Sequence, residues 1–210
     1  MLAETLEEIA IKHSDLLIRN AIRGNEKAFS QLMNLWYKRI YNFCFKYFGN
    51  HDMAMETTQK TFISVHKAIG KLNEPESFKS WIYQIASNKC REEDRKNKRR
   101  SWLSIFQRQE ENDTKVMQLE HHTDDGFYNP DRVIEEKEME NIVMNCLHQI
   151  PEEQRVIVIM KEYEGLKFRE IAVSLSITES TAKSRLYYGL KAMKKQLELR
   201  NIYKENAYGN

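Results

Sequence analysis

Apolar residues recur every three or four positions along most of this chain, which is the spacing of one face of an α-helix. Between residues 25 and 49, that face would consist of Phe29, Leu32, Trp36, Ile40, Phe43 and Tyr47. Asn25 suits the N-cap of this helix, and Gly49 suits its C-terminal end. The same spacing predicts a second helix from about 52 to 68 and a third from about 77 past 90. No segment alternates as a β-strand would.

Polar stretches divide these helices. The segment GKLNEPE, residues 70–76, is predicted to be a turn because Pro75 keeps the residue before it out of helix geometry. From 97 to 129 the helical spacing is lost among polar and acidic residues, which indicates a linker. Helical spacing resumes at Pro130, which suits the first position of a helix capped by Asn129.

A helix predicted to begin at Pro151 leads into the stretch GLKFREIAVSLSITESTAKSRLYYGLKAM, residues 165–193. The apolar positions are Phe168, Ile171, Ala172 and Leu175 before a short turn, and Ala182, Leu186, Leu190, Met193 and Leu197 after it. Two helices joined by so tight a turn cross steeply, so this pattern predicts a helix-turn-helix. The predicted fold class is all-α, with two small helical domains joined by a flexible acidic linker and the helix-turn-helix in the C-terminal domain.

Two residues are unusual for this motif. Ser176 stands where such turns usually carry glycine. Gly189 lies inside the second helix, where glycine costs roughly 1 kcal/mol relative to alanine.

The polar positions of the second helix, which Thr178 would cap, suit contacts with DNA. The candidate residues are Ser180, Thr181, Lys183, Ser184, Arg185, Tyr187 and Lys191. Hydroxyl groups reach phosphates, and long basic side chains reach phosphates or base edges in the major groove. The alternative from this stretch alone is an amphipathic helical pair whose basic face is merely solvated.

The distribution of charge supports a two-part chain. The 210 residues carry a net charge of only +2, because 33 basic residues nearly balance 31 acidic ones. Basic residues crowd 91–100 and 183–195, whereas acidic residues dominate 110–140. Two basic domains would therefore flank an acidic connector. Because that connector is long and polar, we expect the two domains of the free chain to have no fixed separation.

The cysteines and the N-terminus bear on location. Cys44, Cys90 and Cys146 are far apart and odd in number, so we expect buried free thiols in a reducing, cytoplasmic compartment. The N-terminus is broken by charges, and the run VIVIM is too short to cross a bilayer. We therefore expect neither a secretory signal nor membrane insertion.

The sequence contains no clear catalytic or metal-binding motif. His121 and His122 lie in the polar linker, with no cysteine or carboxylate at convincing metal spacing, so we expect no metal and no cofactor. No pair of nucleophile and base stands out, and no glycine-rich phosphate loop is present. An enzyme is therefore the weakest interpretation.

Two longer stretches carry a family resemblance. NEKAFSQLMNLWYKRIYNFCFKYFGNHDMAMETTQKTFISVHKAIGKLNEPESFKSWIYQIASNKCREEDRKNKRR and, after the acidic linker, LHQIPEEQRVIVIMKEYEGLKFREIAVSLSITESTAKSRLYYGLKAMKKQL together resemble an extracytoplasmic-function sigma factor of bacteria. The resemblance implies that the first domain is region two, which binds the clamp of RNA polymerase and opens the minus-ten element. It also implies that the second is region four, which reads the minus-thirty-five element.

The resemblance assigns roles in the first domain. In METTQKTF, it implies that Glu56 and Gln59 contact the clamp helices, whereas Thr57 and Lys60 depart from the usual leucine and acid. In the strand-opening helix, the DNA candidates are Asn88, Arg91, Arg95 and Lys96, and the residues expected to fill the core are Phe78, Trp81 and Ile85. Glu92 stands where many relatives carry aspartate. The loop before this helix resembles the element that captures a flipped base, and Asn73 is the candidate there.

The resemblance also sets the expected domains and partners. The domains are an N-terminal helical extension (1–24), region two (25–100), the linker (101–128), region four (129–200) and a tail (201–210). The expected partners are core RNA polymerase, promoter DNA and an anti-sigma factor. The acidic linker would be repelled by DNA and could occupy a basic polymerase channel. The main alternative is a transcription regulator that binds DNA by itself, which would leave the first domain without a task.

Overall fold

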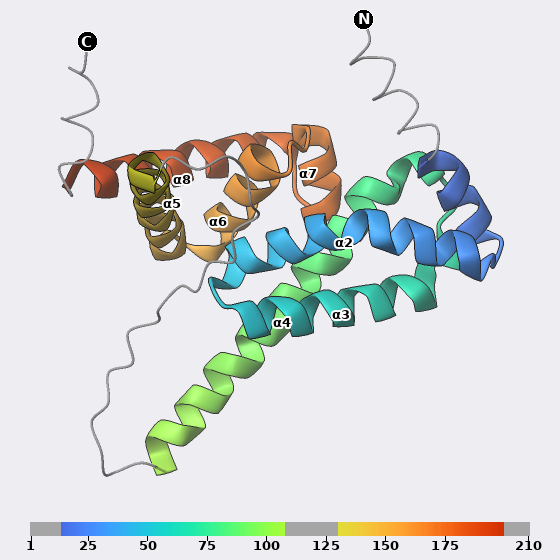
Figure 1. The fold of residues 1–210 in the computed structure, drawn as a ribbon, viewed down its shortest axis with the longest axis horizontal. Helices are drawn as coiled ribbons and strands as arrows, with labels where there is room; N and C mark the ends of the chain where they lie inside the picture. Colours follow the sequence, from blue (N-terminus) through green and yellow to red (C-terminus); the bar gives the residue numbers. More distant parts are fainter. Residues whose placement is uncertain (1–13, 108–129, 200–210) are drawn as a thin grey trace, which may run out of the picture.

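The computed structural model of this chain describes residues 14–107 and 130–199, which form helices joined by short turns and contain no strand (Figure 1). Side chains are described for 14–99 and 138–199. After a helix over residues 14–22, the elements are α2 (Glu26–Phe48), α3 (His51–Ala68), the 3₁₀ turns η1 (Ile69–Lys71) and η2 (Pro75–Ser77), α4 (Phe78–Gln107), α5 (Pro130–Gln149), α6 (Glu152–Val158), the π-helical segment η3 (Ile159–Tyr163), α7 (Phe168–Leu175) and α8 (Glu179–Leu199). The first module comprises the elements up to α4, and the second module comprises α5 to α8.

The predicted caps of α2 are confirmed. The side chain of Asn25 accepts a hydrogen bond from the Ala28 amide at 3.0 Å. At the other end, Gly49 has a left-handed φ of 64° and donates its amide to the Phe45 carbonyl at 2.7 Å. Asn50 then caps α3 through the Met53 amide at 2.9 Å, so α2 and α3 are joined by a single tight corner.

An aromatic cluster forms the core of the first module. Trp36 and Phe43 of α2 meet Phe78 and Tyr83 of α4 edge to face, with ring centroids 5.4 to 6.1 Å apart. Edge-to-face contacts of this kind add stability beyond the burial of area. The helix over residues 14–22 completes the core with Leu17, Ile18 and Ala21, all of them buried.

The helix-turn-helix of the second module has the predicted form. Ser176 adopts a left-handed φ of 54° between α7 and α8, the conformation that would favour glycine. Thr178 caps α8, because its hydroxyl accepts a hydrogen bond from the Thr181 amide at 3.0 Å. Gly189 faces α6, where an added Cβ would lie 3.1 Å from Val158 Cγ2 and 3.2 Å from Gln154 Cβ. This glycine therefore lets α6 and α8 approach each other closely.

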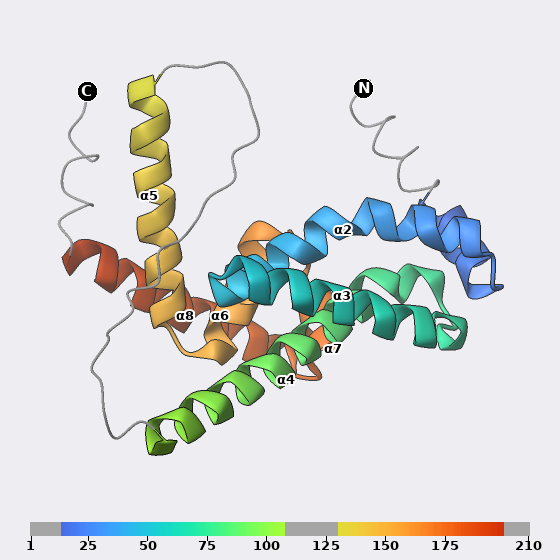
Figure 2. The ribbon, with the colours of Figure 1, turned by 60° about the horizontal axis from the view of Figure 1, so that its bottom comes forward.

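Helix α4 continues beyond the predicted boundary at residue 100 and into the stretch assigned to the linker. Its second half projects from the body of the molecule (Figures 1 and 2). Ion pairs lie along the helix surface before the extension, including Lys98 to Asp94 at 2.8 Å and Lys96 to Glu93 at 2.9 Å. Trp102, Ile105 and Phe106 follow at helical spacing, a signal of the extension that the predicted linker boundary overlooked. Residues 108–129, the remainder of the predicted linker, lie outside the described residues.

The two modules are packed against each other, which corrects the expectation that the free chain holds them at no fixed separation (Figure 2). Helix α7 lies along α4, and buried side chains of both modules form one continuous hydrophobic cluster. The length of the linker said nothing about this packing, because the packing depends on complementary faces of α4 and α7.

Specific polar contacts lie between α4 and the second module. The Tyr83 hydroxyl donates to the Glu164 carboxylate at 2.5 Å, and the Ser174 hydroxyl donates to the Ser80 carbonyl at 2.8 Å. Lys79 pairs with Glu170 at 3.5 Å. The ion pair between Arg91 and Glu152 adds to these contacts between α4 and the second module.

The C-terminal end of α2 makes a second set of contacts between the modules. His148 Nε2 lies 2.9 Å from the Lys46 carbonyl oxygen, and Arg155 donates to the Tyr47 carbonyl at 3.1 Å. These are carbonyls that a helix end leaves without helical partners. A Cβ on Gly49 would overlap the His148 ring, so this glycine is needed for space as well as for its backbone conformation.

We predict that Gly189→Ala destabilises the chain by about 1 kcal/mol, because overpacking outweighs the gain in helix propensity. Val158 is stiff and Gln154 Cβ is fixed to its backbone, so neither neighbour yields easily. Urea unfolding of the full chain measures the effect, with Ser184→Ala on the exposed face of α8 as the control. Stabilisation by Gly189→Ala would show that α6 and α8 do not approach as closely as described.

We also predict that Glu164→Gln increases the free energy of unfolding at neutral pH. Burial raises the pKa of the Glu164 carboxyl, and the hydrogen bond from Tyr83 offsets this only in part. A carboxyl whose pKa is raised on folding destabilises the folded chain once it ionises, so its cost grows as pH rises through that pKa. The stability gained by the glutamine variant should therefore shrink as the pH falls towards about 4, because the Glu164 carboxyl then becomes protonated in the folded and the unfolded chain alike.

Urea unfolding at several pH values tests this prediction, and the same substitution at the exposed Glu162 controls for the loss of one charge. A gain that does not change with pH, or a loss of stability at neutral pH, would contradict it.

Candidate nucleic-acid interface

The first turns of α8 present most of the predicted DNA-binding residues to solvent. Ser180, Lys183 and Ser184 are exposed, whereas Thr181 is half-buried. Lys183, Tyr187 and Lys191 recur every four residues and so form one stripe on the outer face of the helix. The positive end of the helix dipole lies at the same place, which favours a phosphate there.

Arg185 differs from its neighbours because it already has a partner. Its guanidinium lies 2.5 Å from the Glu153 carboxylate in the first turn of α6, and its side chain is only 29% exposed. Lys183 lies above the ring of Phe168 in α7, 5.6 Å from the ring centre. The structure therefore presents Lys183 towards solvent and holds Arg185 against α6.

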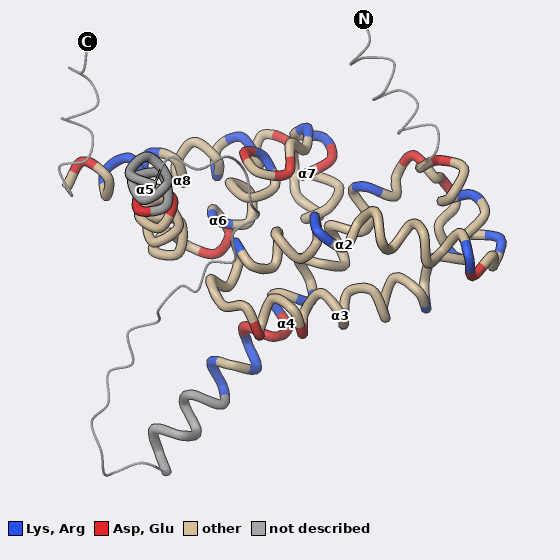
Figure 3. Tube along the Cα trace, in the orientation of Figure 1, with Lys and Arg blue, Asp and Glu red and all other residues tan. Residues whose placement is uncertain are grey.

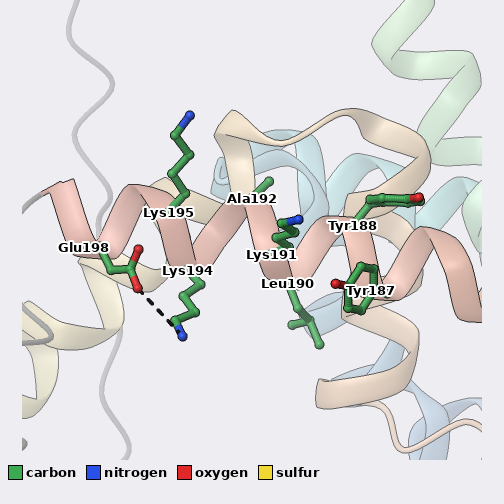
Figure 4. Close-up of a pocket in the computed structure, with 8 residues that line it drawn as sticks. All are labelled: Tyr187, Tyr188, Leu190, Lys191, Ala192, Lys194, Lys195 and Glu198. Carbon is green, nitrogen blue, oxygen red and sulfur yellow. Dashed lines mark ion pairs between the residues drawn. The ribbon is translucent and has the colours of Figure 1, made fainter.

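The basic face continues beyond the predicted residues (Figures 3 and 4). A groove along the C-terminal half of α8 is lined by Tyr187, Tyr188, Leu190, Lys191, Ala192, Lys194, Lys195 and Glu198. Figure 4 shows Lys194 turned towards Glu198, 3.7 Å away. Lys194 and Lys195 belong to the basic run 183–195 noted in the sequence but were not among the candidate DNA contacts, and Tyr188 was not noted, although the spacing of all three from Lys191 indicates a shared face.

A second basic surface lies on α4. Asn88, Arg91 and Arg95 recur at helical spacing on neighbouring positions of one face, and Asn88 and Arg95 are exposed. Arg91 pairs with Glu152 of the second module at 3.0 Å and is 28% exposed. Lys96 pairs with Glu93 on another side of the helix, so it does not join this face.

The turn before α4 forms a small cavity. It is lined by Ala68, Lys71, Leu72, Asn73, Glu74, Ser77 and Trp81. The predicted Asn73 is thus brought together with hydroxyl, ammonium and aromatic groups. Phe78 is fully buried in the core as expected, whereas Trp81 and Ile85 are only half-buried, and Trp81 also lines this cavity. Lys71 and Ser77 lie in the same loop as Asn73, although only Asn73 was named there as a candidate.

The predicted polymerase-binding residues lie on the outward face of α3. Glu56 and Gln59 are exposed, and they share this face with Met55 and Ile63, which are 41% and 54% exposed. Sequence analysis missed these two apolar residues. Thr57 and Thr58 are buried, and the Thr58 hydroxyl donates to the Ala54 carbonyl inside the helix.

Lys60 is explained by contacts within the first module. Its ammonium pairs with Glu56 at 2.6 Å and with Glu93 of α4 at 2.9 Å. Burial alone would raise the pKa of Glu93, but hydrogen bonds from Lys96 and Lys60 outweigh it and hold that pKa below its usual value. Lysine at this position therefore ties α3 to α4, a role that an acid could not perform beside Glu93.

Metal binding and membrane insertion receive no support from residues 14–107 and 130–199. No cluster of three or more histidine, cysteine or acidic side chains is placed there to hold a metal ion. No helix within these ranges is both long and apolar enough to cross a membrane. The thiols of Cys44, Cys90 and Cys146 are buried and form no disulfide, as expected. His121 and His122 lie outside the described residues.

Two family descriptions match this chain in order along the sequence. Residues 32–100 match sigma-70 region 2, and residues 140–193 match sigma-70 region 4.

Curated relatives match along most of their length. The chain is 27% identical over 180 residues to the ECF RNA polymerase sigma factor SigW of Bacillus subtilis, covering 86% of this chain and 94% of that protein. It is 25% identical over 182 residues to the RNA polymerase sigma-H factor of Pseudomonas aeruginosa, covering 87% and 92%.

Solved structures share the fold. One is CnrH in complex with the cytosolic domain of CnrY, with a TM-score of 0.61, 16% identity and coverage of 89% of this chain and 98% of that one. Another is the sigma factor RpoE in complex with the anti-sigma factor NepR from Bartonella quintana, with a TM-score of 0.64, 18% identity and coverage of 82% and 98%.

Proposed function

The chain belongs to the extracytoplasmic-function group of sigma-70 factors, and from this premise we propose how its modules divide the work of promoter recognition. It is a transcription initiation factor that binds RNA polymerase and recognises promoters. The observation that carries the division of labour is the exposed, basic outer face of α8 within the region-4 match. The working domains are residues 25–100 for region two and 129–200 for region four, joined by 101–128.

The second module reads the minus-thirty-five element through the start of α8. Lys183, Tyr187 and Lys191 form the stripe that faces the groove, with Ser180, Thr181 and Ser184 beside phosphates. Arg185 joins them once it leaves Glu153. The capped, positively polarised start of α8 supports this orientation.

The first module opens the minus-ten element. Asn88, Arg91 and Arg95 follow the displaced strand along α4, and Lys96, on another side of the helix, adds positive charge nearby. The cavity beside Asn73 receives a flipped base, because it combines the amide with Ser77 and the aromatic face of Trp81. A flipped base requires such a combination of stacking and hydrogen bonding.

Core polymerase binds the outward face of α3. Glu56 and Gln59 supply polar contacts, and the exposed Met55 and Ile63 supply apolar area at the centre of the same face. The function needs no catalytic residue or cofactor of the chain itself, since polymerase performs the chemistry. A cytoplasmic location follows from that partner.

An anti-sigma factor is a further proposed partner. Sigma factors of the same fold have been solved in complex with CnrY and with NepR, and those partners belong to those proteins. Support for such a partner of this chain comes from exposed apolar side chains on both modules, including Ile63 and Tyr188.

We predict that Glu56→Lys combined with Gln59→Ala weakens co-purification with core polymerase by at least tenfold, roughly 1.4 kcal/mol. Charge reversal replaces an attractive contact with a repulsive one on the outward face of α3. The ion pair that it removes, between Glu56 and Lys60, is largely exposed, so the fold should be retained. Circular dichroism confirms folding, and Glu26→Lys on the exposed start of α2 provides the same charge change elsewhere. Undiminished binding by the folded double variant would remove these residues from the interface.

We also predict that Lys183→Ala lowers affinity for promoter DNA containing the upstream element, by about 1–3 kcal/mol if the side chain reaches a base edge. A phosphate contact would instead weaken matched and scrambled sites alike and reduce the salt slope by about one. Titration of polymerase holoenzyme on both sites at several salt concentrations separates these cases. Lys27→Ala, at an exposed lysine of α2 in the first module, is the control. Equal affinity of Lys183→Ala and wild type for both sites would mean that the wrong face was chosen.

A further inference from the structure

Arg185 is the only arginine among the proposed DNA contacts of α8, and it lies off the outer stripe of that helix. It precedes Gly189 by four positions, which places it on the side of α8 that packs on α6. A Cβ on Gly189 would lie 3.2 Å from Gln154 Cβ, and Glu153 directly precedes Gln154. Arg185 Nη2 lies 2.5 Å from Glu153 Oε2. Helix packing therefore places a carboxylate beside the one guanidinium that could read a base.

The ion pair between Arg185 and Glu153 lies at the surface of the second module. The glutamate side chain is 64% exposed and the arginine side chain 29%. A surface ion pair contributes little to stability, so it can be exchanged for another partner without unfolding the module. The proposed function requires Arg185 to leave Glu153, and the cost of leaving depends on the new partner.

A DNA phosphate is a poor exchange for Glu153. The guanidinium would give up one surface ion pair and form another, so the exchange itself gains little. The displaced carboxylate would then stand unpaired beside the negative charge of the DNA backbone, and like charges at short distance repel. This cost is the same for every DNA sequence, because every nucleotide carries a phosphate.

A guanine edge differs from a phosphate because it carries no net charge. Its N7 and O6 atoms accept two hydrogen bonds from one guanidinium, whose planar fork matches them. The guanidinium has five N–H donors and the contact with Glu153 uses Nη2, so its departure need be only partial. The carboxylate can remain a neighbour of the cation while other donors bind the base. A guanine edge therefore offers Arg185 more than a phosphate does.

We propose that Glu153 is a specificity-determining residue, which keeps Arg185 from phosphates on unmatched DNA and releases it to a guanine edge in the minus-thirty-five element. The inference rests on the proposed function, because it concerns how the second module reads that element. Glu153 acts through Arg185 and is a positioning residue. Without its carboxylate, Arg185 binds phosphate on any sequence, so affinity for unmatched DNA rises and discrimination falls.

The test uses Glu153→Gln in the full chain, assembled into polymerase holoenzyme. Affinity is measured at several salt concentrations for a promoter mapped by its transcript start and for the same DNA with the minus-thirty-five element scrambled. We expect affinity for the scrambled DNA to rise about fivefold and its salt slope to increase by about one, as one added phosphate contact would give. The ratio of matched to scrambled affinity should fall by about the same factor.

Two controls separate this effect from the loss of one negative charge. Glu179→Gln removes an exposed carboxylate from the first turn of α8, and it should change matched and scrambled affinities alike. In an Arg185→Ala background, Glu153→Gln should no longer change the ratio, because the residue through which it acts is gone. Circular dichroism verifies that each variant is folded.

A second variant tests the part of the arginine without altering Glu153. Arg185→Lys keeps a cation for the glutamate but replaces the planar fork with a point charge. It should lower affinity for the matched site several-fold, as the loss of a bidentate base contact would, and leave the scrambled site unchanged. Equal affinity of Arg185→Lys and wild type for the matched site would show that the arginine reads no base there.

Three results with Glu153→Gln would overturn the proposal. The first is an equal rise at both sites, as with Glu179→Gln, since Glu153 would then act only as a local charge. The second is a lower affinity for the matched site, since the carboxylate would then support the arginine's contact with the base. The third is a ratio that changes equally in the Arg185→Ala background. A wild-type holoenzyme that does not distinguish the two sites would contradict the proposed function itself, and that comparison is made before any variant.

Discussion

Helix α4 takes part in two cores at once, and the rest of the structure depends on this double use. Its inner side carries Phe78 and Tyr83 into the aromatic cluster with α2, while the neighbouring side receives α7. Tyr83 belongs to both, because its ring packs in the first module and its hydroxyl reaches Glu164 in the second. Separation of the modules would therefore break the hydrogen bond from Tyr83 to Glu164, whereas the ring of Tyr83 could stay packed in the first core. The proposed DNA-binding surface of α4 lies next to the same contact.

Much of the local structure could be predicted from the sequence, because its causes are local. Asn25 and Gly49 bound α2 through cap geometry, and Thr178 caps α8 for the same reason. Ser176 was noted as an unusual turn residue, and it does adopt the left-handed conformation that glycine would favour. Gly189 was noted as a cost, but its reason is the approach of Val158 from α6, which lies 31 positions away in the sequence and left no periodic trace.

Most remaining features depend on contacts that periodicity cannot show. The extension of α4 past residue 100 was missed because the polar run before it was taken as the start of the linker, although Trp102, Ile105 and Phe106 follow at helical spacing. The exposure of most candidate site residues was predictable from helical spacing. The ion pairs of Arg91 and Arg185 were not, because their partners Glu152 and Glu153 come from α6. For the same reason, the packing of the modules contradicted an expectation based only on linker length and polarity.

The central claim is that this chain directs RNA polymerase to promoters and that its two modules read their elements only in the complex. Footprinting on promoters mapped by transcript starts, with the purified chain alone and with core polymerase at one near-physiological salt concentration, tests it most directly. The account predicts no specific protection by the chain alone, and joint protection of the minus-thirty-five and minus-ten elements, with strand opening, once core is added. Specific nanomolar protection of both elements by the chain alone, unimproved by core, would contradict it.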